Sequence, residues 1–158
     1  MTQLRRPLLL AAATIAAVGA LAAPAQAKIV HFTSPSGNID CLGITDGTVF
    51  VQCVVQKAEW PRRPRRPASC DLDFSPTEIQ LANRKVTVGA CRGDIGPLCL
   101  PSGGDRCSVL GYGRSVSIGG ISCSSATTGV TCRYKRPSAP GNKRPGFRVS
   151  RQGYTILR

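Results

Sequence analysis

Two features of the sequence together constrain the fold: an apolar N-terminal segment, and eight cysteines that all follow it. Arg5 and Arg6 precede an apolar run over residues 8–23, and Ala25-Gln26-Ala27 supplies a small-x-small cleavage motif. This order is typical of a secretory signal peptide. We therefore expect residues 1–27 to be removed by cleavage after Ala27 and the protein to be secreted. An even number of cysteines then enters an oxidising space, where disulfides persist.

An uncleaved membrane anchor is the alternative for this segment. The apolar run has about 16 residues, fewer than the roughly 20 that a membrane-spanning helix needs. Pro7 follows Arg5-Arg6 directly, which departs from a twin-arginine signal. No later segment is long enough and apolar enough to span a bilayer, so we expect no transmembrane anchor in the mature chain.

Residues 28–158 are long enough for one domain, and helix signals in them are weak. The chain has 17 Gly and 12 Pro, and short β-branched runs alternate with turns. This pattern predicts an all-β fold, a small disulfide-stapled domain built from β-hairpins. One short helix or turn is expected over Thr77–Asn83, because Ser75-Pro76 precedes it and Glu78 lies in its first turn. The expected strands are Ile29–Thr33, Asn38–Gly43, Val49–Gln56, Val86–Cys91, Val116–Ile118, Ile121–Ser124, Val130–Tyr134, Phe147–Ser150 and Tyr154–Leu157.

An internal echo suggests two related hairpin units. In each unit an Ile-x-Cys segment, ending at Cys41 or Cys123, precedes a Val-x-Cys segment that ends at Cys53 or Cys132. Residues two apart in a strand share a face, so the apolar residue and the cysteine lie together. The second hairpin needs only a four-residue loop over 126–129. The first turns at Asp46-Gly47 and needs a longer loop or a bulge for its cysteines to meet.

The two hairpins favour the disulfides Cys41–Cys53 and Cys123–Cys132. A Cys99–Cys107 bond would close the Gly-rich loop over residues 100–106, and Cys70 and Cys91 then remain to tie the central segment. Eight cysteines allow 105 pairings, so the sequence alone leaves the full set open.

Charge and one basic segment point to an anionic partner. Without Arg5 and Arg6, 19 basic side chains face 8 acidic ones, a formal charge of +11. Residues 61–67 form a Pro/Arg linker, and polyproline II geometry would place its prolines on one ridge. The arginines on the other two ridges, Arg62, Arg63, Arg65 and Arg66, suit phosphate or carboxylate groups. The alternatives are a solvated linker and a charge that only maintains solubility.

A second basic region runs over residues 133–158 and contains eight Lys or Arg and no acid. Aromatic residues do not alternate with these cations, which argues against specific nucleic-acid binding.

Motifs along the chain resemble a family of small, secreted, cysteine-rich actinobacterial proteins of unknown function. The matching segments are Phe32–Ile39 with Cys41, Cys53, Trp60, Cys70–Phe74, Cys91–Asp94, Tyr112-Gly113, Gly120 with Cys123, Gly129–Cys132, Gly146–Arg151 and Tyr154. The resemblance implies no activity and transfers no catalytic residue. Members often have a His beside the late Gly-Phe, whereas Pro145 stands nearby here, and Cys99 and Cys107 look like an added pair.

Catalytic and metal-binding motifs are poorly supported. His31 is the single histidine, no Cys-x-x-Cys occurs, and Asp71-x-Asp73 lacks the spacing of a calcium loop, so we expect no metal or other cofactor. Arg92-Gly93-Asp94 spells an adhesion tripeptide, although Gly-Asp is more simply a turn.

We therefore expect a secreted, non-catalytic binding module. Its expected partner is an anionic polymer, a lipid headgroup or an acidic protein at the cell envelope. Two alternatives remain: a small hydrolase that uses acids near Asp71 and Asp94, and an inhibitor or effector that presents the Cys99–Cys107 loop.

Overall fold

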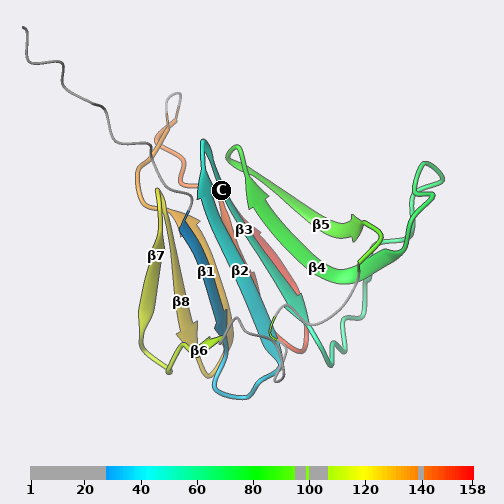
Figure 1. Cartoon of the computed structure of the whole chain (residues 1–158), viewed down its shortest axis with the longest axis horizontal. Helices are drawn as coiled ribbons and strands as arrows, with labels where there is room; N and C mark the ends of the chain where they lie inside the picture. Colours follow the sequence, from blue (N-terminus) through cyan, green and yellow to red (C-terminus); the bar gives the residue numbers. More distant parts are fainter. Residues whose placement is uncertain (1–27, 95–98, 100–106, 139–140) are drawn as a thin grey trace, which may run out of the picture.

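The computed structural model describes residues 28–94, 99, 107–138 and 141–158, and these form two β-sheets that lie one behind the other (Figure 1). The expected signal peptide lies outside the described residues. Within the described ranges the secondary structure consists of strands and turns, which confirms the all-β prediction.

The first sheet has six strands in the order β5-β4-β3-β2-β1-β6. Five of them form an antiparallel meander in which each strand pairs with the next along the chain. The sixth, β6, pairs in parallel with β1 at the edge. The strands are β1 Lys28–Thr33, β2 Ile39–Asp46, β3 Thr48–Val55, β4 Phe74–Ala82, β5 Lys85–Cys91 and β6 Ser108–Val109.

The second sheet is another antiparallel meander, with the order β11-β10-β9-β8-β7. Its strands are β7 Ser115–Ile118, β8 Ile121–Ala126, β9 Gly129–Tyr134, β10 Gly146–Val149 and β11 Tyr154–Leu157. All nine expected strands are present, and β4 and β6 were not expected. The chain therefore completes one meander before it begins the other.

The two hairpin units occupy equivalent central positions, one in each sheet. Cys41 lies opposite Cys53 in β2 and β3, and Cys123 lies opposite Cys132 in β8 and β9. The Cα atoms are 4.1 and 4.0 Å apart, which brings the side chains of each pair together. We call Cys41–Cys53 and Cys123–Cys132 the hairpin disulfides. Cys70–Cys91 and Cys99–Cys107 are the other two bonds, so the structure contains the set that the sequence favoured.

The expectation of a bulge or a longer loop in the first hairpin was wrong. Pairing runs without a break from Ile39 opposite Val55 to Asp46 opposite Thr48, so only Gly47 connects the two strands. Gly47 has φ +63, a left-handed conformation that costs glycine nothing. This conformation turns the chain within one residue and keeps the cysteines in register.

The short helix or turn predicted over Thr77–Asn83 was also wrong for most of its length, because this segment lies in β4 as far as Ala82 and only Asn83 lies in a turn. Ile79 and Leu81 alternate toward the core and are completely buried, which is the period of a strand. A register shift between Ser75 and Ile79 interrupts pairing with β5. Pro76 lies in this bulge, where its missing N–H is tolerated. The Ser-Pro-x-Glu pattern that resembles a helix start therefore marks a bulged strand.

The hydrophobic core lies between the sheets and contains both hairpin disulfides. Val51, Ile79, Ile121 and Phe147 are among its completely buried side chains. A Cβ at Gly43 of β2 would lie 2.6 Å from Ile118 Cδ1 of β7. Such close approach of the two inner faces is the packing of a β-sandwich.

The turns gather at two opposite ends of this sandwich, because strand direction alternates in a meander. At one end, the β10–β11 end, lie the β1–β2, β8–β9 and β10–β11 turns. At the other, the β4–β5 end, lie the β4–β5 turn, the β9–β10 loop and the end of β11. Figure 1 shows the β1–β2 turn at the bottom and the C-terminus at the top.

Candidate functional site

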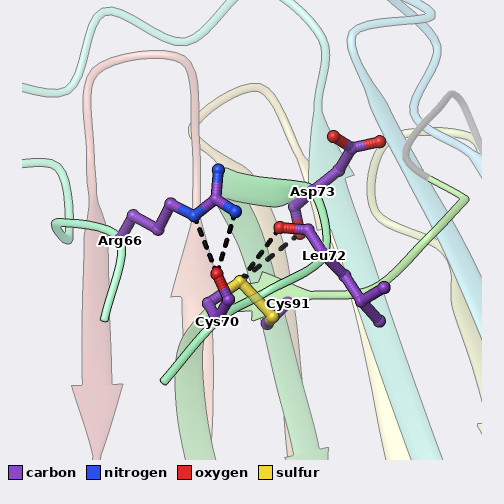
Figure 2. The surroundings of a disulfide bond; sticks show 5 residues. All are labelled: Arg66, Cys70, Leu72, Asp73 and Cys91. Carbon is purple, nitrogen blue, oxygen red and sulfur yellow. Dashed lines mark hydrogen bonds between the residues drawn. A yellow bond between two sulfur atoms is a disulfide. The ribbon is translucent and has the colours of Figure 1, made fainter. Parts of the chain in front are cut away.

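The Pro/Arg segment, residues 61–67, connects β3 to β4 and is partly packed on the first sheet. A Cβ at Gly89 in β5 would lie 3.1 Å from Pro64 Cγ, so Pro64 sits close above that strand. At its far end, Arg66 donates from Nε and Nη2 to the carbonyl of Cys70, at 3.0 and 2.8 Å (Figure 2). Cys70 is itself fixed by its disulfide to Cys91. The structure therefore gives Arg66 an intramolecular partner.

The other three arginines of this segment differ in their surroundings. Arg63 donates to the carbonyl of Ala58. Arg62 and Arg65 are exposed, and Arg62 borders a hollow described below. The four guanidinium groups are therefore not equivalent, and Arg62 and Arg65 are the two of this set best placed to meet a partner.

Trp60 anchors the start of the segment to the second sheet. Its side chain is 4% exposed, and its indole Nε1–H donates to the Ser150 carbonyl at 2.9 Å. Its ring centroid lies 4.9 Å from that of Tyr154 in β11. The backbone N–H of Glu59 also donates to the carbonyl of Arg151, at 2.7 Å. These contacts hold the segment against the β10–β11 turn.

This anchoring creates a hollow of about 520 Å³ with an aromatic wall, which we call the aromatic hollow. The residues that line it come from the start of the Pro/Arg segment and from the β10–β11 turn: Trp60, Pro61, Arg62, Gln152, Gly153 and Tyr154.

A second hollow of about 200 Å³, the hydroxyl hollow, lies at the same end of the sandwich. Three turns and Tyr112 line it with hydroxyl and amide groups. Its lining residues are Ser34, Ser36, Asn38, Ile39, Tyr112, Ala126, Thr127, Thr128, Gly129, Ser150, Arg151 and Gln152. Tyr112 is 48% exposed and therefore presents its ring to solvent.

Local hydrogen bonds fix the β1–β2 turn that forms one wall of the hydroxyl hollow. The hydroxyl of Ser34 accepts from the N–H of Ile39 at 3.1 Å and lies 3.1 Å from the hydroxyl of Ser36. The Asn38 carboxamide accepts from the N–H of Lys57 at 2.8 Å. The turn is therefore ordered before any ligand arrives, which lowers the entropic cost of binding.

Gly129, on another wall, is required by close packing. A Cβ there would lie 2.1 Å from the carbonyl oxygen of Val149 in β10, and the residue has φ +123. The sequence predicted a four-residue loop over residues 126–129. The structure instead pairs Gly129 with Ala126, which leaves Thr127 and Thr128 as the loop.

The two hollows both border Gln152, and we call them together the groove. Its cationic groups are Arg62 and Arg151, both exposed, and none of its lining residues is Asp or Glu. Hydroxyl and carboxamide groups both donate and accept hydrogen bonds, and guanidinium groups pair with carboxylate, sulfate or phosphate. The groove therefore suits an oxygen-rich anion.

Sequence reasoning singled out Arg62 but missed the rest of the groove. Ser34, Tyr112 and Arg151 were noted only as part of a family resemblance. The order of the strands could have indicated these residues. In two successive meanders every second turn lies at the same end, so residues in those turns come together.

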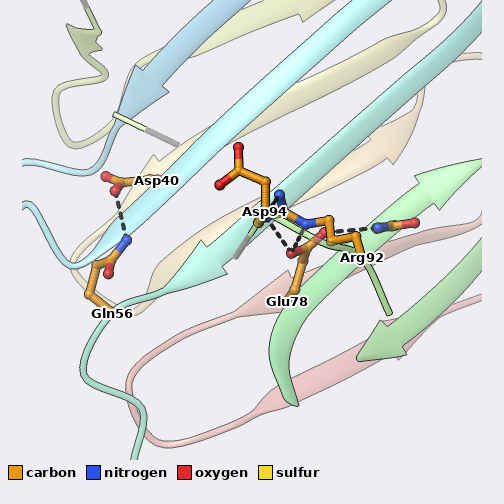
Figure 3. A network of polar contacts seen from close by, with 6 residues as sticks. Asp40, Gln56, Glu78, Arg92 and Asp94 are labelled. Atoms are coloured by element: carbon orange, nitrogen blue, oxygen red, sulfur yellow. Dashed lines mark hydrogen bonds and ion pairs between the residues drawn. The ribbon is translucent and has the colours of Figure 1, made fainter. Parts of the chain in front are cut away.

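Two buried carboxylates, those of Glu78 and Asp40, lie on the first sheet, and both are paired. Glu78 is completely buried and accepts from Arg92 Nε and Nη2, at 3.1 and 2.9 Å, and from Gln80 Nε2, at 2.8 Å (Figure 3). Asp40, which is 4% exposed, accepts from the Gln56 carboxamide at 2.9 Å. These carboxylates are therefore occupied by partners within the chain.

The acids of the hydrolase alternative, Asp71 and Asp94, are exposed. The structure places neither of them in the lining of the groove. Arg92 of the adhesion tripeptide donates to Glu78 and to the carbonyl of Asp94, so its guanidinium has a structural role. Residues 100–106, the loop of the inhibitor alternative, lie outside the described residues.

Two features are absent from the described part of the chain. No group of three His, Cys, Asp or Glu side chains there is arranged to hold a metal ion. No helix there has the length and apolarity to cross a membrane.

Comparison with known proteins places the chain in one family. No curated protein matches it. No solved structure matches it either. Residues 10–154 match a family of unknown function, DUF6636, over nearly the whole sequence. The chain is therefore a member of the DUF6636 family.

Proposed function

We propose that this protein is an exported, non-catalytic binding module that holds an anionic polymer in the groove at the β10–β11 end. The observation that supports this most directly is the lining of the groove, which combines hydroxyl and amide groups with Arg62 and Arg151 and contains no carboxylate. Four disulfides support export, because such bonds persist in oxidising compartments.

A polymer, rather than a small anion, fits the shape of this surface. The two hollows adjoin at Gln152, and the exposed Arg65 follows Arg62 in the same Pro/Arg segment. An extended chain would place successive anionic groups near Arg151, Arg62 and Arg65. The net charge of +11 that remains without Arg5 and Arg6 adds a long-range attraction that salt weakens.

The test is a titration of the oxidised protein with heparin and with poly(glycerol phosphate) at several salt concentrations. In the variant Arg62→Ser/Arg65→Ser/Arg151→Ser we expect at least a tenfold loss of affinity. The slope of log affinity against log salt should also fall by about 2–3, because fewer counterions are released.

The control is Lys28→Ser/Lys135→Ser/Arg148→Ser, which removes the same charge from exposed positions outside the groove. It should retain most of the affinity. Equal losses in the two triple variants would mean that only net charge matters, and the groove proposal would then be rejected.

An Arg66→Ser variant distinguishes this proposal from the sequence-based expectation that all four arginines of residues 61–67 bind the anion together. Because Arg66 already donates twice to the Cys70 carbonyl, we expect its removal to change affinity less than Arg62→Ser does.

A further inference from the structure

A third hollow, of about 340 Å³, lies at the β4–β5 end of the sandwich, opposite the groove. We call it the basic hollow. It is lined by the β4–β5 turn, the β9–β10 loop and the end of the chain: Arg84, Lys85, Val86, Ser138, Lys143, Pro145, Ile156, Leu157 and Arg158. Its volume falls in the range of cavities that bind small molecules.

Arg84 is held rigidly at the edge of this hollow. Asn83 and Arg84 form the two-residue turn between β4 and β5, with φ +47 and +60. A left-handed conformation costs an arginine roughly 1–2 kcal/mol. Contacts with the second sheet offset this cost: the Arg84 N–H donates to the Tyr134 hydroxyl at 3.2 Å, and its guanidinium lies 4.5 Å from the Tyr134 ring centroid.

The Arg84 guanidinium is only partly satisfied by these contacts. Its Nη2 donates to the carbonyls of Arg136 and Lys143, at 2.9 and 3.3 Å. Its Nε is buried and has no hydrogen-bond partner among the described residues. The Arg84 side chain therefore holds its positive charge at the edge of the hollow, where an anion would be attracted to it.

Arg133, which does not itself line the basic hollow, fixes a second wall of it. It donates from Nε to the carbonyl of Arg144, at 2.6 Å, and from Nη2 to the carbonyl of Arg158, at 2.9 Å. These bonds join the β9–β10 loop to the end of the chain. Both walls of the hollow are therefore preorganised.

The charged side chains that line the hollow are all positive. Arg84, Lys85, Lys143 and Arg158 come from three separate segments, and no Asp or Glu is among the lining residues. Like charges that line one hollow repel one another. An anion in the hollow would convert this repulsion into attraction, and a dianionic phosphate monoester would do so best.

Apart from Ser138, the remaining lining is apolar. Val86, Pro145, Ile156 and Leu157 form this part of the surface, and Ile156 is 50% exposed although it is a large aliphatic residue. An inorganic anion would leave these side chains in water. A ligand with an apolar chain would cover them, at about 25 cal/mol per Å² removed from water.

We propose that the basic hollow binds a phosphate monoester that carries an apolar chain, with the phosphate among the four cations and the chain against Val86 and Ile156. The shared chemistry is that of a phosphorylated amphiphile, whether it is embedded in a membrane or dissolved. This inference is independent of the groove, since the two sites have no residue in common.

The test uses the oxidised protein and four probes. The membrane probe is a phosphatidylcholine vesicle doped with phosphatidate, and its reference is a pure phosphatidylcholine vesicle. The dissolved probes are dihexanoyl phosphatidate and inorganic phosphate. We expect the doped vesicle, the short-chain phosphatidate or both to bind at least tenfold more tightly than inorganic phosphate. Tight binding of the doped vesicle alone would identify a membrane lipid as the ligand, and tight binding of the short-chain phosphatidate alone would identify a dissolved amphiphile.

Two variants test the two halves of the hollow. Lys85→Ser/Lys143→Ser should weaken binding of the amphiphile at least tenfold. Ile156→Ser should weaken it severalfold and leave the response to inorganic phosphate unchanged. The control Lys28→Ser/Lys57→Ser removes the same charge from exposed positions that do not line the hollow.

Three results would overturn the inference. If pure phosphatidylcholine vesicles bind as tightly as doped vesicles, the phosphate monoester has no role in binding. If inorganic phosphate binds as tightly as the amphiphile, the apolar lining has no role in binding. Equal losses in the lysine variant and its control would show that only net charge acts. Because all these positions are at the surface, unchanged thermal unfolding of each variant would verify its fold.

Discussion

The ion pair between Glu78 and Arg92 offers the sharpest test of how the first sheet is stabilised, and the perturbation is Arg92→Leu. Glu78 is completely buried and accepts two N–H groups from Arg92 and one from Gln80. Without Arg92, one hydrogen bond remains to a buried charge. Removing one partner of a buried pair typically costs 3–5 kcal/mol.

The lower end of that range applies here, because the Arg92 side chain is 27% exposed and water can partly replace it. A loss of about 3 kcal/mol corresponds to a fall in Tm of roughly 10 °C for a domain of this size. It is also a large part of the 5–15 kcal/mol by which a typical domain is stable.

The assay is thermal and urea unfolding of Arg92→Leu, with Arg148→Leu on β10 as the exposed control. The control should change stability by about 0.5 kcal/mol or less. The double variant Glu78→Gln/Arg92→Leu should recover about 1–2 kcal/mol relative to Arg92→Leu, because it buries an amide and not a charge. If the double variant is no more stable than Arg92→Leu, the reasoning from an uncompensated buried charge is wrong.

Two further stability predictions concern disulfides and glycines. Removing either hairpin disulfide by paired Cys→Ala substitution should lower Tm more than removing Cys99–Cys107, because all four hairpin cysteines are completely buried. If the Cys99/Cys107 variant loses as much Tm or more in thermal unfolding, this order is wrong. Gly129→Ala should lower the free energy of unfolding in urea by more than 2 kcal/mol, because its Cβ would lie 2.1 Å from a carbonyl oxygen. Gly37→Ala, at a residue with φ +66 and open space around it, should lower the same free energy by about 1 kcal/mol. Similar losses at the two glycines would show that the β10 backbone moves aside.

Much of the fold could be predicted from the sequence because its signals are local. Cys41 and Cys53, or Cys123 and Cys132, lie in adjacent strands joined by short turns, so spacing alone indicated the pairs. The strand β4 could not be recognised in this way. Its Pro76 and Glu78 are tolerated only because β5 leaves a bulge and Arg92, 14 residues later, compensates the carboxylate.

The candidate sites could be predicted only in part. Arg62 was visible in a repetitive Pro/Arg sequence, but the hydrogen bonds that occupy Arg63 and Arg66 depend on the conformation of the chain. The basic hollow joins Arg84 to Lys143 and Arg158, which are far apart in sequence and meet only when the second sheet packs on the first. Patterns in a sequence do not report such packing.

The order of the cysteines has a consequence for how the protein matures. Each cysteine is bonded to the next one along the chain, so two bonds lie within residues 41–91 and two within residues 99–132. A chain that emerges N-terminus first therefore exposes each thiol shortly before its native partner. An oxidant that joins each pair as it appears makes the native set with no wrong bond to reshuffle. None of the four bonds links the two meanders, so the finished halves dock through the apolar core and through the contacts of Glu59, Trp60 and Arg84.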